Sequence, residues 1–293
     1  MKTLIEIIHS LRPQQWIKNL FIFAPLLFSR NLFDLSMGLR VLGAFFLFCL
    51  ISGASYILND LMDLEEDKNH PLKRQRPLPS GRLKKKSAFF ALVLISVLSL
   101  FTALVWNTSF GLVLLLYFLV QIGYSLWLKH IVILDVFLVA AGFALRVIAG
   151  GLVISVTISP WLLICTLLLA LFLALSKRRH ELLLLDDKAA GHRPILSEYS
   201  PYLLDQMIAV VTASTVISYC LYTIAAETIA KFGTEHLFAT VPFVLYGIFR
   251  YLYLIHRRSG GGMPETLILK DKPLLLAIIL WVISAALIIY YKV

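Results

Sequence analysis

A dense group of acidic residues follows the second apolar stretch of the chain, and its spacing suggests chemistry. The segment reads Asn59-Asp60-Leu-Met-Asp63-Leu-Glu65-Glu66-Asp67. At about 3.6 residues per turn, Asp60, Asp63 and Asp67 lie on one helical face. Three carboxylates on one face repel one another unless a cation joins them, and Mg²⁺ is usually bound by one or two carboxylates plus substrate phosphates. The spacing therefore predicts a magnesium site.

Basic residues follow the acids within the same polar segment. Lys73 and Arg76 come at most nine positions after Asp67. Carboxylates for a metal and cations for phosphate, side by side, describe a diphosphate site, because Lys and Arg form charge-assisted hydrogen bonds with phosphate oxygens. The alternative is a solvated charged loop. The later run Lys84-Lys85-Lys86 fits that alternative better, as a signal of membrane orientation.

The elements that must position these residues are membrane-spanning helices. Of the 293 residues, 59% are hydrophobic and 15% are charged, whereas soluble domains average about 45–50% and 25%. The apolar residues gather into nine stretches whose lengths suit helices of roughly 20 residues better than barrel strands of about 10. The stretches cover residues 17–28, 39–58, 88–105, 110–128, 133–154, 160–176, 207–226, 236–255 and 273–291. We therefore expect an all-α integral membrane bundle of about nine transmembrane helices, forming one domain over residues 1–293.

The first apolar stretch differs from the others. It is short, it carries Pro25, and Lys18 and Asn19 interrupt its start. The interruption does not match a cleavable signal peptide, and no small-residue cleavage site follows the stretch. We expect a kinked or tilted span, or one that does not cross the membrane completely.

Charge sets the orientation of this bundle. The polar segments alternate in size, and those on the side of the amino terminus hold 21 of the 27 Lys and Arg residues. Cytoplasmic segments are enriched in Lys and Arg, so this side is expected to face the cytoplasm and to form a polar cap. The site is then expected on the cytoplasmic side of a bacterial-type inner membrane. Nine spans would leave the carboxyl terminus outside.

Composition also excludes whole classes of function. The apolar excess excludes a water-soluble globular protein, a disordered chain and a nucleic-acid-binding protein, although the net charge is +10. Cys49, Cys165 and Cys220 all lie in apolar segments, far apart, so a disulfide framework or a thiolate metal site is not expected. The basic excess must instead reflect membrane orientation or anionic ligands.

The acidic segment resembles a known motif. Its pattern of one Asn and three Asp residues is similar to the first aspartate-rich motif of the UbiA superfamily of membrane prenyltransferases. Two further patterns resemble the decaprenyl-phosphate phosphoribosyltransferase branch. The resemblance to this branch runs through most of the chain up to about Tyr202 and is weak beyond it. The two patterns read His70-Pro71-x-Lys73-x-x-Arg76-Pro77-x-x-x-Gly81 and Arg12-Pro13-x-Gln15-Trp16-x-Lys18-Asn19. The branch implies 5-phosphoribose 1-diphosphate (PRPP) as donor and a polyprenyl phosphate as acceptor.

Typical prenyltransferases of the superfamily carry a second DxxxD-type motif, and this sequence departs from it. The corresponding region begins at Tyr124. It keeps only the acid Asp135 and has Val139 at the second position. Lys129 precedes this acid and Arg146 follows it. The departure argues against a prenyl diphosphate donor and fits the phosphoribosyl branch. For Asp135 a supporting role and a catalytic role stay open.

Arg146 falls about halfway along a predicted span, where an ionisable side chain is expensive and indicates a functional site by default. PRPP carries a 5-phosphate besides its diphosphate, and an extra phosphate favours cations over a second acidic cluster. The alternative is an ion pair with Asp135. Their spacing of 11 residues makes a direct pair within one helix poor, so we predict phosphate binding.

Other substrate-binding candidates lie at the same side of the membrane. Lys18 stands where the family pattern has a lysine. Tyr56 shares a helical face with Asn59, although a tyrosine of the interfacial aromatic belt is the alternative. Lys177 belongs to the cluster Ser176-Lys177-Arg178-Arg179-His180-Glu181, which closes another span. Contact with anionic lipids explains that cluster equally well.

Together these features predict a Mg²⁺-dependent membrane transferase. Asn59, Asp60, Asp63 and Asp67 would hold the metal, and the three aspartates would be catalytic. The substrate-binding residues would be Lys18, Tyr56, Lys73, Arg76, Tyr124, Lys129, Asp135, Arg146 and Lys177. Two other hypotheses are a prenyltransferase that moves an isoprenoid to an aromatic or other small acceptor, and a transporter or lipid-binding protein. The partners expected are PRPP, a polyprenyl phosphate lipid and the membrane, with no nucleic acid. A homo-oligomer stays open.

Overall fold

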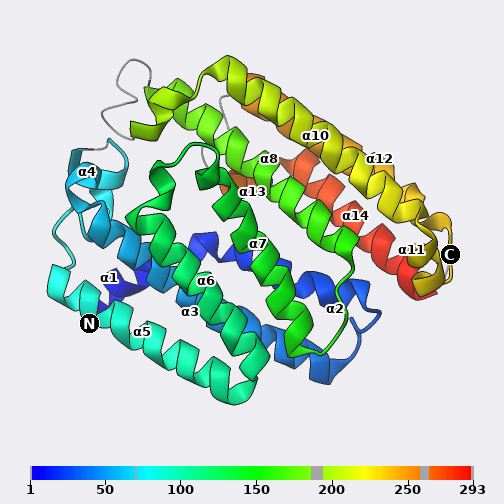
Figure 1. Cartoon of the computed structure of the whole chain (residues 1–293), viewed down its shortest axis with the longest axis horizontal. Helices are drawn as coiled ribbons and strands as arrows, with labels where there is room; N and C mark the ends of the chain where they lie inside the picture. The colour runs from blue at the N-terminus through cyan, green and yellow to red at the C-terminus, as the bar shows by residue number, and fades with distance from the viewer. Residues whose placement is uncertain (1, 70, 186–193, 258–263, 292–293) are drawn as a thin grey trace.

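The computed structural model describes residues 2–69, 71–185, 194–257 and 264–291. Within these ranges every regular element is a helix, as Figure 1 shows. The prediction of an all-α bundle is therefore confirmed.

Eight of the nine apolar stretches form helices that are long and apolar enough to cross a membrane. They are α3 (Leu35–Met62), α5 (Lys85–Trp106), α6 (Thr108–Leu126), α7 (Leu134–Val153), α8 (Pro160–Leu185), α10 (Pro201–Ile224), α12 (Val241–Arg257) with the 3-10 helix η6 (His236–Thr240) before it, and α14 (Lys272–Tyr291). The clearest difference from the predicted ranges is in α8, which continues past Ser176 into the segment expected to be a loop. The basic cluster therefore sits on a helix.

Side-chain caps mark where several of these helices begin. Asp34 precedes α3 and accepts a hydrogen bond from the Met37 amide at 2.9 Å. Asn107 lies between α5 and α6 and accepts from the Phe110 amide at 2.9 Å. Such caps satisfy backbone N–H groups that have no partner in the first helical turn. They explain the short turns at the ends of long apolar segments.

The first apolar stretch does not form one α-helix. It folds as a long 3-10 helix, η1 (Pro13–Phe23), followed by the short α2 (Ala24–Phe28). At about 2.0 Å per residue in a 3-10 helix and 1.5 Å in an α-helix, this segment is about 30 Å long, the thickness of a hydrocarbon core. The stretch is therefore a ninth, largely 3-10 segment that is long enough to cross, although it has too few residues for an α-helical span.

The helices form two groups that share a central pair. Figure 1 shows α3, α5 and α6 on one side, α10, α12 and α14 on the other, and α7 and α8 between them. One apolar core joins α7, α8, α10 and α12 around Phe172 and Leu204. Another joins η1, α3, α6 and α7 around Ile22 and Phe48. Many large apolar side chains point outward, as expected for a lipid-facing surface. Phe101, for example, is 65% exposed.

Most of the polar connections gather at one end of the bundle. There α3, α6, α8 and α12 end, and α5, α7, α10 and α14 begin. Short elements build this end: α1 (Lys2–Ser10), α4 (Leu64–Asn69), η2 (Lys73–Gln75), η3 (Leu128–His130), η5 (Pro194–Glu198) and α13 (Pro264–Lys270). At the other end the longest described connection carries α11 (Ala226–Phe232) and η6. The predicted polar cap is present.

Candidate active site at the polar end of the bundle

The acidic residues lie across a helix break. Helix α3 ends at Met62, and Asp63 leaves the helical conformation with φ −92° and ψ 15°. The chain resumes at once as α4, where the Asp67 amide donates to the Asp63 carbonyl at 2.8 Å. The prediction of one continuous helical face was therefore wrong in detail. Asp60 lies in the last turn of α3, Asp63 lies at the break, and Asp67 lies on α4.

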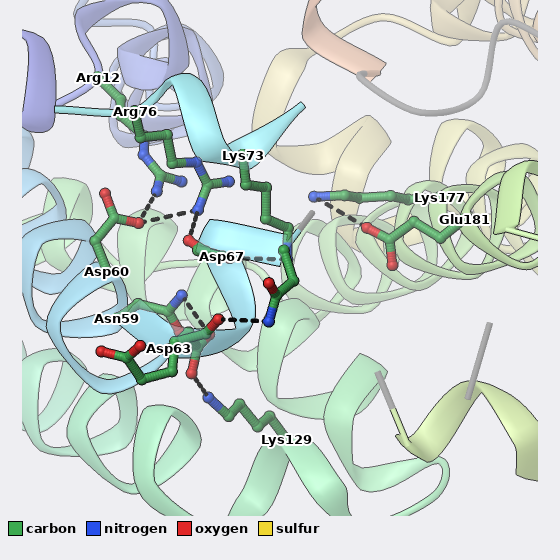
Figure 2. A network of polar contacts seen from close by, with 12 residues as sticks. Arg12, Asn59, Asp60, Asp63, Asp67, Lys73, Arg76, Lys129, Lys177 and Glu181 are labelled. Atoms are coloured by element: carbon green, nitrogen blue, oxygen red, sulfur yellow. Dashed lines mark hydrogen bonds and ion pairs between the residues drawn. The ribbon is translucent and has the colours of Figure 1, made fainter. Parts of the chain in front are cut away.

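Two of the carboxylates meet at one arginine (Figure 2). Arg76 donates from a single nitrogen, Nη1, to Asp60 Oδ1 at 3.0 Å and to Asp67 Oδ2 at 2.6 Å. Lys73 lies 3.4 Å from Asp67, and Arg12 also donates to Asp60. Asp60 and Asp67 are each only 1% exposed. The loop after α4 therefore folds its cations back onto the buried acids, as the sequence predicted for Lys73 and Arg76.

The third carboxylate has separate partners. Asp63 accepts from Asn59 Nδ2 at 3.0 Å and forms an ion pair with Lys129 of η3. Lys129 is itself buried. The structure therefore brings Lys129, which is 66 residues away in sequence, to the acidic motif. We call this set the acid cluster: Asn59, Asp60, Asp63 and Asp67 with Arg12, Lys73, Arg76 and Lys129.

The donors of the acid cluster fit a hard divalent cation. Asp60 Oδ2 is buried and has no hydrogen-bond partner, so one carboxylate oxygen is left for a further ligand. Arg76 Nη1 already lies between Asp60 and Asp67, in a position that a cation would share. Among the described residues no three His, Cys, Asp or Glu side chains converge closely enough to hold a metal ion without rearrangement. Metal binding would thus require Arg76 to move off its carboxylates.

A second polar network centres on Arg178 of α8. It donates to Asp135 Oδ2 and to Glu181 Oε2, each at 2.6 Å, and to the Tyr124 hydroxyl at 3.2 Å. Tyr199 donates to the other oxygen of Asp135 at 2.9 Å. Burial raises the pKa of Tyr199 to about 12, so its phenol keeps the proton that it donates. Asp135 is fully buried and both of its oxygens are engaged.

The remaining candidates lie around these two networks. Lys177 lies 3.8 Å from Glu181, and Figure 2 shows both side chains extending from α8 toward the acid cluster. The Tyr56 ring lies beneath the guanidinium of Arg12, with 4.8 Å from the guanidinium carbon to the ring centroid. Lys18 donates to Gln15 of its own segment at 3.5 Å. His70, part of the motif quoted above, lies outside the described residues.

Arg146 is not brought to either network. Its Nε, Nη2 and Nη1 atoms donate to the Asn19 side chain, the Tyr117 hydroxyl and the Gly142 carbonyl, respectively. It contacts Phe48, which precedes Asn59 by 11 residues on α3, about 16 Å at 1.5 Å per residue. The alternative of an ion pair with Asp135 is also excluded, because both oxygens of Asp135 bond to Arg178 and Tyr199.

Sequence reasoning gave no role to two residues of the site. Arg12 appeared only as part of a motif, and its pairing with Asp60 joins residues 48 apart in sequence. Its backbone has φ 51° and ψ 64°, a left-handed conformation that is unusual for a residue other than glycine and common at functional sites. Tyr199 gave no sequence signal, because it follows an ordinary polar loop and reaches Asp135 only through the fold.

A helical membrane bundle with buried acids and opposing cations at one end defines a membrane-embedded enzyme site. Residues 20–270 match the UbiA prenyltransferase family. The chain belongs to this family and is an integral membrane transferase. The match continues well beyond Tyr202, so the expectation that the resemblance is weak in the last third of the chain was too narrow.

Curated relatives cover almost the whole chain. A decaprenyl-phosphate phosphoribosyltransferase of Corynebacterium glutamicum is 32% identical over 97% of this chain and 86% of its own length. A protein of the same name from Mycobacterium tuberculosis H37Rv is 30% identical, covering 94% and 91%. A solved UbiA homologue from Archaeoglobus fulgidus, bound to DMAPP and Mg²⁺, superposes with a TM-score of 0.72 over 98% of this chain and 100% of its own, at 20% identity. The fold is therefore that of a UbiA-type membrane protein.

Proposed function

We propose that this protein transfers the 5-phosphoribosyl group of PRPP to a polyprenyl phosphate and releases diphosphate. The names of the curated relatives support this activity. The observation that carries the proposal is the ion pair between Asp135 and Arg178. Asp135 is the one acid left in the region that corresponds to the second motif, since position 139 is Val. This single carboxylate pairs with a buried arginine, so the region lacks the second acidic cluster that a prenyl diphosphate donor would be expected to use.

The charge of the acid cluster supports a donor rich in phosphate. Its three aspartates face four cations, which are Arg12, Lys73, Arg76 and Lys129. All four interact with carboxylates, so each can exchange that partner for a phosphate oxygen. The cluster can thus bind a divalent metal on its acids and a diphosphate on its cations, with Lys177 on the facing helix for the 5-phosphate.

Mg²⁺ fits the donors of Asn59, Asp60, Asp63 and Asp67, all of which are hard oxygens. When bound, it would neutralise charge on the departing diphosphate. The chain's own part is to position the donor and to stabilise the leaving group. Arg76 and Lys73 lie on the loop after α4 and can follow the diphosphate, while Lys129 approaches from η3. Such preorganised cations act where negative charge develops.

The acceptor makes few demands on the protein. A polyprenyl monophosphate is already anionic, so its oxygen attacks the anomeric carbon of the ribose without a general base. The bond from that carbon to the diphosphate oxygen breaks as the new carbon–oxygen bond forms. The isoprenoid chain reaches the site from the bilayer. The excess of Lys and Arg at the polar end supports a site that faces the cytoplasm of a bacterial-type inner membrane.

The alternative is transfer of an isoprenoid from its diphosphate to an aromatic or other small acceptor. The experiment that separates the two gives the purified protein Mg²⁺, a polyprenyl phosphate and radiolabelled PRPP, and follows label in the lipid phase. We expect labelled lipid and free diphosphate. Failure to label the lipid, together with prenyl transfer from a prenyl diphosphate to an aromatic acid, would refute the proposal.

A further inference from the structure

Arg146 lies deep in the membrane-spanning part of α7. It is 12 residues after the start of the helix, about 18 Å along its axis at 1.5 Å per residue. Its side chain is 5% exposed. In the described part of the chain no carboxylate forms an ion pair with it. An intramembrane arginine is costly and is usually retained for a function.

Neutral groups hold this guanidinium. Nε donates to Asn19 Oδ1 at 2.7 Å, Nη2 to the Tyr117 hydroxyl at 2.9 Å and Nη1 to the Gly142 carbonyl at 2.7 Å. The rings of Tyr117, Phe143 and Phe48 lie 4.8, 5.3 and 5.4 Å from the guanidinium carbon. Aromatic faces stabilise a desolvated cation. Three of its five N–H donors are thus bonded to neutral groups, and aromatic rings cover the guanidinium.

The partner Asn19 connects this arginine to the 3-10 helix η1. Asn19 is buried and also donates to Ser52 Oγ at 3.2 Å and to Cys49 Sγ at 3.1 Å, both on α3. One guanidinium and one carboxamide therefore tie η1 to α3, α6 and α7. Asn19 and Ile22 are the two residues of η1 that are buried, and they are three positions apart, as one face of a 3-10 helix requires.

A second contact fixes the register of η1 against α7. A Cβ on Gly150 would lie only 2.0 Å from the Ile22 carbonyl oxygen, so the two backbones touch at this glycine. The two contact points on α7, Arg146 and Gly150, are four residues apart, about 6 Å at 1.5 Å per residue. The matching points on η1 are three residues apart, which is about 6 Å in a 3-10 helix and about 4.5 Å in an α-helix. The 3-10 rise gives the closer match.

The conformation of η1 also sets where Arg12 lies. Arg12 immediately precedes η1 and pairs with Asp60 in the acid cluster. Seven residues separate it from Asn19, about 14 Å in a 3-10 helix and about 10.5 Å in an α-helix. Relaxation to an α-helix would thus withdraw Arg12 by about 3.5 Å relative to α3, more than the length of a hydrogen bond.

We propose that Arg146 is a positioning residue that holds Pro13–Phe23 in the 3-10 conformation and thereby places Arg12 at Asp60. The effect of Arg146 on turnover rests on the proposed function, whereas its effect on η1 does not. Arg146 acts through Asn19 and does not touch substrate. This role replaces the phosphate binding that its sequence position suggested.

Hydrogen exchange of the full-length protein in detergent tests the structural step without any substrate. In Arg146→Gln we expect peptides over residues 13–28 to exchange at least about tenfold faster, because the bonds that hold η1 are lost. Gly150→Ala should do the same with Arg146 intact. Asn19→Ala gives the same test if Gly150→Ala does not fold. Arg250→Gln is the matched control, since this span arginine pairs with Asp271 instead, and it should leave residues 13–28 unchanged.

Turnover of PRPP supplies the second readout. A misplacement of a few ångströms can cost about 100-fold in rate, so we expect Arg146→Gln and Gly150→Ala to lose activity to a similar degree. Arg146→Lys should resemble Arg146→Gln, because an ammonium keeps the charge but lacks the planar fork whose three separate nitrogens reach Asn19, Tyr117 and Gly142. Unchanged exchange over residues 13–28 in Arg146→Gln would overturn the inference, whatever the activity. Wild-type protein that does not use PRPP would refute the proposed function and leave the exchange result standing.

Discussion

Arg178 donates from Nε to Asp135 Oδ2 across 2.6 Å, and it comes from α8 to an acid at the start of α7. Asp135 is fully buried and Arg178 is 5% exposed. The remaining guanidinium nitrogens bond to Glu181 and to the Tyr124 hydroxyl. The pair therefore ties the two central helices together beside the acid cluster.

The first prediction concerns the stability that this pair provides. Asp135→Asn removes the charge that faces a buried guanidinium, and such a change costs about 3–5 kcal/mol in proteins. We expect a marked fall in the unfolding temperature of the detergent-solubilised protein. Asp271→Asn is the control, because its partner Arg250 is 23% exposed. This variant should lose about 1 kcal/mol or less of unfolding free energy. Weaker Mg²⁺ binding by Asp135→Asn at unchanged stability would instead identify Asp135 as a metal ligand.

The second prediction concerns competition between Arg76 and the metal. Arg76 Nη1 holds Asp60 and Asp67 together, so Mg²⁺ must displace it to reach both carboxylates. In Arg76→Gln the two acids lose the cation that they share, although Arg12 and Lys73 stay beside them. Mg²⁺ alone should therefore raise the unfolding temperature more than in the wild type. PRPP should bind less tightly, because a phosphate-binding cation is lost. An identical response of both proteins to Mg²⁺ would show that the metal does not bind between these acids.

The third prediction tests the metal-binding role of Asp63. Asp63→Asn keeps the shape of the side chain but removes a charged ligand, and we expect a loss of about 100-fold or more in kcat/KM for PRPP. Glu65→Gln is the control, because Glu65 is exposed and pairs only with exposed lysines. Its activity should match that of the wild type. Full activity in Asp63→Asn would remove Asp63 from the metal site.

The same residues show how much of the fold and of the candidate site can be predicted from the sequence. Apolar length predicted nine spans, of which eight form long apolar helices. Spacing grouped Asp60 with Asp67. Both predictions succeed because periodicity and burial are local properties. The break at Asp63 was not predictable from helix period alone. At the break Asp63 pairs with Lys129, which is 66 residues away in sequence.

The 3-10 segment and the role of Arg146 escaped sequence reasoning for a related reason. Nothing in Pro13–Phe23 requires a 3-10 helix, whose geometry is poorer than that of an α-helix. Its conformation follows from two contacts with α7, at Arg146 and Gly150. The sequence indicated an arginine inside a span, but its partner Asn19 lies 127 residues away. Pairings at that separation exist only in the folded bundle.

The fourth prediction is a pH dependence from Tyr199. Its phenol has a pKa of about 12 in the folded protein because of burial, against about 10 in an unfolded chain. Since the unfolded chain loses this proton first, the stabilisation is complete below pH 10 and is lost as the pH rises from 10 to 12. We expect wild-type stability to fall more steeply over this interval than that of Tyr199→Phe, measured by chemical unfolding. Parallel curves would mean that Tyr199 does not hold Asp135 through its proton.

The last prediction separates the backbone and the side chain of Arg12. Its φ of 51° is left-handed, a conformation that costs about 1–2 kcal/mol for residues with a Cβ and little for glycine. Arg12→Gly and Arg12→Ala both remove the cation from Asp60, but only glycine relieves the strain. We expect Arg12→Gly to unfold at a higher temperature than Arg12→Ala.

Activity should follow the charge instead of the strain. Both variants lose the guanidinium that pairs with Asp60, so their rates with PRPP should fall together, while Arg12→Lys keeps part of the activity because the charge remains. The left-handed backbone is then maintained in order to aim a cation at the acid cluster. A variant Arg12→Gly with wild-type activity and increased stability would contradict this, since it would make the arginine dispensable and leave its strained backbone without a function.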